Sequence, residues 1–178
     1  IRDCHDMCQI GYMVDTKPEG NGVVELASHE ECAKNKKTSA ATFKTIEEES
    51  NKLNQTTLVQ SVGNRYVVVT PPYSPMTTEE LDAVYELPFT RQPHPKYKGK
   101  TIPAFDMIRW SVNTHRGCWG GCAFCTISMH QGKFVVSRSL DSILKEVRTL
   151  ASDPEFKGYL SDLGGPSANM YMMRGKNQ

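Results

Sequence analysis

The chain has 178 residues, of which 38% are hydrophobic and 23% are charged, and its formal net charge is +1. This composition is ordinary for a globular protein, and the near-neutral charge argues against a large surface for nucleic acid or acidic lipid. No apolar run approaches the length of a membrane span. Six cysteines without a visible signal peptide fit a reducing compartment, so we expect a cytoplasmic protein.

The first third of the chain contains few strong patterns. Residues 1–37 hold a turn cluster and one short apolar run at residues 23–26, and they support no firm assignment. Residues 38–53 predict a helix with Glu47, Glu48 and Glu49 on its solvated face. Its inner side is expected to hold Ala40, Phe43, Ile46 and Leu53.

A β-hairpin is the clearest upstream feature. Residues 58–62 and 66–70 are rich in β-branched side chains and flank Gly63-Asn64, a two-residue connection typical of hairpins. A capping box follows, with Thr77 at the N-cap and Glu80 at the third helical position, and it predicts a short helix.

Prolines then interrupt a basic stretch, which we interpret as an extended connector without a regular helix or internal strand. These prolines are Pro88, Pro93, Pro95 and Pro103. We therefore divide the chain into an accessory and connector segment, residues 1–103, and a second domain, residues 104–178.

The second domain has the order strand, loop, helix, strand. Apolar and polar residues alternate over 107–113, which predicts a strand. Ser139 begins a helix that is apolar at Leu140, Ile143, Leu144, Val147 and Leu150, and residues 158–163 predict a second strand. This order implies two parallel strands whose carboxyl ends bring the loops 116–125 and 164–166 together.

The first of these loops carries three cysteines at x3 and x2 spacing, Cys118, Cys122 and Cys125. Three thiolates can hold three corners of an iron-sulfur cubane, and the neighbouring glycines let the backbone curl around it. An electron-transfer protein normally supplies a fourth cysteine, which this loop lacks. An iron without a protein ligand can instead bind a substrate or cofactor.

Other interpretations of these residues stay open. The three cysteines with His115 or His130 could form a zinc site in a structural or nucleic-acid-binding module. Phe124 and Trp119 could be core aromatics, and Arg138 could support the following helix or reach the loop. Three further cysteines, Cys4, Cys8 and Cys32, are interpreted as ordinary thiols.

The amino-acid sequence around the cysteines resembles that of the YgiQ-type proteins of the radical S-adenosylmethionine (SAM) superfamily. The segments that carry the resemblance are residues 116–125, 137–139 and 161–171, with residues 65–69, 71–72 and 91–95 upstream. The resemblance implies that a 4Fe-4S cluster is held by Cys118, Cys122 and Cys125. It also implies that SAM binds the open iron and is cleaved by one electron to a 5'-deoxyadenosyl radical.

The same resemblance suggests residues for SAM. Phe124 matches the position that contacts adenine, and Gly164 and Gly165 match the motif that approaches the methionyl amino group. Pro166 stands where many members carry a glutamate, so Asp162 is the candidate carboxylate. The electron is expected to come from a reductant protein of the flavodoxin or ferredoxin type.

The fold implied is α/β, the opening part of an incomplete (β/α)6 TIM-like barrel preceded by an accessory segment with a hairpin and short helices. Six units of roughly 30 residues need about 190 residues, but only about 75 of the 178 follow Pro103. We therefore expect an internal piece of a longer enzyme that is inactive alone. The substrate, and any use of cobalamin or a second cluster, does not follow from these residues.

Overall fold

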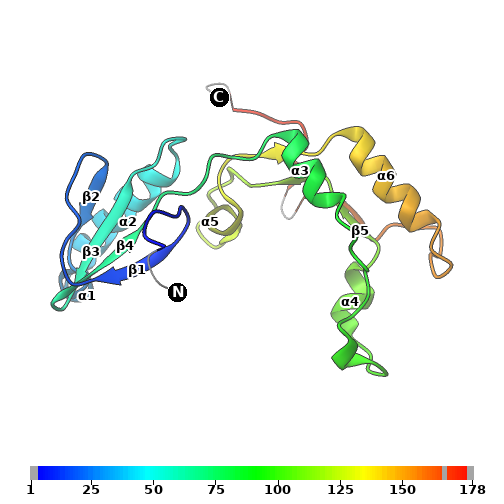
Figure 1. Ribbon diagram of the computed structural model, residues 1–178, viewed down its shortest axis with the longest axis horizontal. Helices are drawn as coiled ribbons and strands as arrows, with labels where there is room; N and C mark the ends of the chain where they lie inside the picture. The colour runs from blue at the N-terminus through cyan, green and yellow to red at the C-terminus, as the bar shows by residue number, and fades with distance from the viewer. Residues whose placement is uncertain (1–3, 166–167, 176–178) are drawn as a thin grey trace. The chain divides into compact units, whose positions relative to one another are not determined.

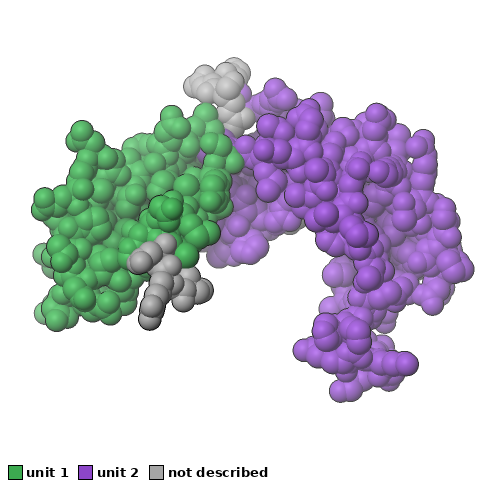
Figure 2. Space-filling view, viewed as in Figure 1, with its two compact units in different colours: residues 1–74 green, residues 75–178 purple. Residues whose placement is uncertain are grey.

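The structure is a computed structural model that describes residues 4–165 and 168–175. The chain forms two compact units, residues 1–74 and residues 75–178 (Figure 2). Residues 75–103, which the sequence pattern assigns to the upstream segment, lie within the second unit. The division into functional domains stays a prediction. Within the described residues no helix is long and apolar enough to cross a membrane.

The first unit is built on a four-stranded sheet in the order β1-β4-β3-β2 (Figure 1). Antiparallel pairing joins β4 to β1 and to β3, whereas β2 is parallel to β3. The predicted hairpin is confirmed, and Gly63 in its turn has a φ of 60°. Val59 and Val68 are paired across the two central strands and are fully buried. The strands are β1 Gly11–Val14, β2 Val23–Leu26, β3 Thr57–Val62 and β4 Arg65–Val69.

Two helices, α1 (His29–Lys34) and α2 (Lys36–Ser50), complete the first unit. The predicted helix is confirmed as α2, although it ends at Ser50, before Leu53. Its predicted faces are wrong in part. Phe43 is 59% exposed, whereas Glu49 is 6% exposed. The reason is tertiary: the Glu49 carboxylate pairs with Lys52 and accepts a 2.8 Å hydrogen bond from the Thr56 hydroxyl, which ties the helix end to the start of β3.

The second unit begins with α3 (Thr78–Tyr85), whose predicted capping box is confirmed. The short elements that follow are η1 Pro95–Tyr97, α4 Pro103–Ile108, β5 Ser111–Asn113, β6 His115–Arg116, α5 Ile127–Gln131, β7 Val136–Ser137, α6 Leu140–Ala151 and β8 Asp162–Gly164.

The strand predicted over residues 107–113 is wrong in its first half. Pro103 occupies the first turn of α4, where its fixed φ and missing N–H are tolerated, and the helix runs to Ile108. Met107 and Ile108 are consequently exposed. Only Ser111–Asn113 form the strand, so the apolar alternation that suggested a longer one belongs to two different elements.

The strand-helix-strand order is confirmed. β5 and β8 are parallel, with Asn113 opposite Gly164 at their carboxyl ends, and α6 lies between them in sequence. The second strand starts at Asp162, later than expected, and directly before it the Ser161 N–H donates a 3.1 Å hydrogen bond to the Trp110 carbonyl. A mixed α/β unit is established, and the (β/α)6 barrel stays a prediction. The core contains Trp110, Val112, Ile143 and Leu150, with Val147, Phe156, Leu160 and Tyr171 packed against it.

Candidate functional site: the cysteine loop and the end of β8

The three clustered cysteines lie on a loop whose two ends are joined by backbone hydrogen bonds. β6 pairs with β7 in antiparallel fashion, His115 opposite Ser137 and Arg116 opposite Val136. Beyond this stem, the Cys118 N–H donates a 3.0 Å hydrogen bond to the Gly132 carbonyl. Residues 118–132 are therefore presented by a short two-stranded stem that the sequence pattern did not reveal.

Glycine at position 117 is required by this stem. Gly117 has a φ of 89°, and a Cβ there would lie 2.0 Å from the Phe134 carbonyl oxygen. Gly132 has nearly the same φ, 88°, but nothing lies within 4 Å of its Cβ position. The backbone at Phe134 therefore passes too close to residue 117 to leave room for any side chain there.

The cysteine side chains differ in exposure. Cys118 is buried, Cys125 is partly buried and Cys122 is exposed. A Cβ on Gly120 would lie 3.3 Å from the Cys118 sulfur and 3.6 Å from the Cys122 sulfur, so these two sulfurs flank one glycine. The Gly120 N–H also donates to the Cys118 sulfur at 3.4 Å.

This donor set fits an iron-sulfur cluster. Thiolates are the usual ligands of such clusters, and N–H groups directed at their sulfurs tune the potential. Within the described residues, no group of three or more His, Cys, Asp or Glu side chains is placed to hold one metal ion.

Phe124, the expected adenine contact, is 90% exposed. The side chain is therefore not part of the core, which was the competing interpretation of this residue. Trp119 is 43% exposed. An exposed aromatic ring beside the last cysteine is available to stack on a planar ligand. The adenine contact itself stays a prediction.

The end of β8 lies against the segment that leads into the cysteine loop. The Gly164 carbonyl accepts a 2.8 Å hydrogen bond from the Thr114 N–H. The Asp162 carboxylate lies 3.7 Å from the position of a Cβ on Gly164, so both residues share one face. Pro166 lies outside the described residues. The roles of Asp162, Gly164 and Gly165 in SAM binding stay predictions.

His115 joins these two parts and was only a weak candidate from sequence. Its side chain is fully buried, and its ring occupies the space where a Cβ on Gly165 would lie. Burial lowers the pKa of His115 from its usual 6.5, and the Ala168 backbone opposes this in part. No local signal reveals this contact, because its partners follow β8.

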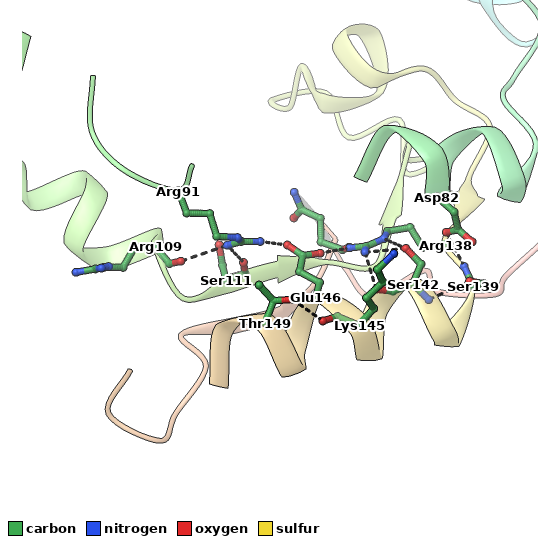
Figure 3. Close-up of polar contacts among 11 residues, drawn as sticks. Asp82, Arg91, Arg109, Ser111, Arg138, Ser139, Ser142, Lys145, Glu146 and Thr149 are labelled. Atoms are coloured by element: carbon green, nitrogen blue, oxygen red, sulfur yellow. Dashed lines mark hydrogen bonds and ion pairs between the residues drawn. The ribbon is translucent and has the colours of Figure 1, made fainter. Parts of the chain in front are cut away.

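A partly buried ionic network supports the same strands (Figure 3). Arg138 is 1% exposed, donates a 2.8 Å hydrogen bond to the Asn113 carbonyl at the end of β5, and pairs with Glu146 of α6. Glu146 also pairs with Arg91, which bonds to the Ser111 carbonyl at 3.4 Å. Arg138 therefore supports the helix and strand, as one of the two sequence interpretations proposed.

Comparisons with known proteins identify the family of the chain. The family described as "Radical SAM N-terminal" matches residues 1–111, which end before the cysteine loop. A "UPF0313 protein" of Bacteroides thetaiotaomicron is 65% identical over 155 residues, covering 87% of this chain and 25% of that protein. The "UPF0313 protein YgiQ" of Escherichia coli K12 is 46% identical over 162 residues, covering 90% of this chain and 22% of that protein.

These matches show that the chain belongs to the radical SAM superfamily. Within that superfamily, it belongs to the YgiQ-type, or UPF0313, proteins. The chain spans about a quarter of the length of these curated relatives. No solved structure gave a significant match.

Proposed function

We propose that this chain contributes the cofactor-binding part of a radical SAM enzyme. The observation that carries the proposal is the closed glycine loop with three cysteines, whose stem contacts the glycines at the end of β8. In this proposal Cys118, Cys122 and Cys125 hold a 4Fe-4S cluster. When bound, the cluster supplies the electron that cleaves SAM to a 5'-deoxyadenosyl radical, which abstracts a hydrogen atom from the substrate.

The residues of the chain have distinct tasks in this proposal. The Cys118 sulfur is shielded from water and accepts a hydrogen bond from the Gly120 N–H. This hydrogen bond would stabilise the negative charge of the sulfur when it holds the cluster. Phe124 offers an exposed ring to adenine. The Asp162 carboxylate is exposed beside Gly164, where it can pair with the SAM ammonium group.

The whole protein's reaction is a wider proposal, because the chain spans about a quarter of its relatives. We propose a cytoplasmic enzyme that receives its electron from a flavodoxin- or ferredoxin-type protein. The hydrogen donor is a substrate held by residues beyond this chain as well as by the loops described here.

Cluster analysis of the full-length protein tests the proposal. After anaerobic reconstitution, replacing Cys118, Cys122 and Cys125 by serine should remove about four irons and four sulfides per chain. Cys32→Ser is the matched control, because this thiol lies in the first unit beside Thr42, 3.4 Å from its hydroxyl. Stoichiometric zinc without sulfide on these cysteines would overturn the proposal and favour the structural zinc module.

A further inference from the structure

We propose that His115 is a positioning residue: its buried ring fixes the backbone after β8 against the stem that presents the cysteines. The effect on SAM rests on the proposed function, whereas the effect on the backbone does not. Neither the family match nor the cysteine spacing assigns this role to His115.

The His115 ring fills the space that a side chain at position 165 would need. A Cβ on Gly165 would lie 2.1 Å from both Cε1 and Nε2 of His115 and 2.8 Å from Cδ2. Because the ring is fully buried, it has little room to move away. Glycine at position 165 is therefore required by His115, in addition to any approach of its backbone to SAM.

Both ring nitrogens of His115 have polar neighbours. The Thr114 hydroxyl lies 3.0 Å from Nδ1 of His115, and the Met170 N–H points to Nε2 at 3.4 Å. The Ala168 backbone also interacts with the ring. Since the Thr114 N–H bonds to the carbonyl of Gly164, two consecutive buried residues contact the last residue of β8 and three residues after it.

His115 also lies close to the cysteine loop in the chain. It is the first residue of β6 and stands three positions before Cys118. A shift of the ring would therefore move the stem of the cysteine loop together with Gly164, Gly165 and Met170. His115 thus couples the expected cluster side and the expected methionyl side of one cofactor site.

Steric rescue in the full-length, reconstituted protein tests this role. SAM affinity is read from the change that SAM causes in the electron paramagnetic resonance spectrum of the reduced cluster. Gly165→Ala should weaken SAM binding about tenfold or more, because the added methyl displaces the ring. His115→Ala added to Gly165→Ala should recover part of this loss, since the methyl then has space, while iron content stays constant.

Gly164→Ala is the matched control, because its Cβ position has only an ordinary contact of 3.7 Å with Asp162. Any loss in Gly164→Ala should not be recovered by His115→Ala. His115→Gln keeps an acceptor for the Met170 N–H and should retain more affinity than His115→Ala. Equal losses for Gly165→Ala with and without His115 would overturn the proposal.

A second readout separates this role from the proposed function. Hydrogen exchange of the peptide containing Met170 should become faster in His115→Ala and less so in His115→Gln, even without cluster or SAM. If the wild-type protein binds no cluster, the proposed function fails while this exchange result still decides the role of His115. Unchanged exchange in both variants would overturn the positioning role.

Discussion

The sheet of the first unit and the strand pairs of the second unit obtain their register in different ways. In the first unit, four strands pair in one sheet, and Val59 and Val68 are buried on its two central strands. In the second, β5 and β8 pair over three residues and β6 and β7 over two. Such short pairs are not stable alone, so buried side chains such as Arg138 and His115 hold them in place.

The two units should therefore differ in their sensitivity to single substitutions. A long ladder distributes its stability over many equivalent hydrogen bonds, so the loss of one side chain is tolerated. The candidate site depends on a few polar side chains that each bond to several segments. Single substitutions should therefore disturb the second unit more than the first.

The largest effect is expected for the Arg138–Glu146–Arg91 network. Glu146→Gln removes the carboxylate that pairs with both arginines and should destabilise the second unit by about 3–5 kcal/mol. Hydrogen exchange of α6 in the full-length protein measures this loss. Glu25→Gln, which breaks the exposed pair with Lys17 in the first unit, is the control and should change little. Equal destabilisation by Glu146→Gln and Glu25→Gln would contradict the expected difference in sensitivity between the two units.

A smaller effect is expected at the base of the cysteine loop. Gly117→Ala should destabilise the stem by about 1–3 kcal/mol more than Gly132→Ala, because only residue 117 meets a carbonyl oxygen at 2.0 Å. Since φ is nearly equal at both glycines, the difference isolates the steric contact. Iron retention during dilution of the reconstituted protein provides the measurement, and equal retention by both variants would contradict the described stem.

Acid should loosen the second unit before the first. Burial keeps the pKa of His115 below 6.5, so the unfolded state binds more protons and stability falls as pH drops below about 6.5. The hydrogen bond from Lys52 lowers the pKa of Glu49 below 4.5, so the stability it gives is lost only at still lower pH.

Hydrogen exchange of the two units between pH 7 and 4 distinguishes these steps. In His115→Gln, the loss of stability of the second unit below about pH 6.5 should become smaller, while the loss in the first unit at lower pH remains. The same pH dependence in wild type and His115→Gln would show that another group controls the second unit.

The smallest difference between the units is expected at the helix N-termini, because α1 and α3 both begin with a capping box. Ser28 caps α1 and Thr77 caps α3, each in a capping box. Ser28→Ala and Thr77→Ala should each cost about 1 kcal/mol, because a cap acts on its own helix. Thermal unfolding of the two variants checks this equality, and a much larger loss for Thr77→Ala would reveal an additional long-range role.

Local features were predictable from the sequence. The Gly63-Asn64 hairpin, the Thr77 capping box and the helix after Ser139 each depend on residues that are neighbours in the chain. The strand over 107–110 was mispredicted because apolar alternation counted for more than Pro103, which starts a helix.

Contacts between distant segments were not predictable. Glu49 was assigned to a solvated face because its partner Thr56 lies beyond the helix. The glycines at 117 and 165 were recognised, but the atoms that require them belong to Phe134 and His115. The spacing of the cysteines predicts the candidate cluster, whereas the geometry of the site depends on packing that no local pattern encodes.

The most direct test of the account is the formation of 5'-deoxyadenosine by the full-length protein, supplied with SAM and a reductant under anaerobic conditions. We expect that the wild type and Cys32→Ser form this product, and that serine at Cys118, Cys122 and Cys125 abolishes it. Cluster-loaded wild-type protein that forms no 5'-deoxyadenosine above the level of the serine variant would contradict it.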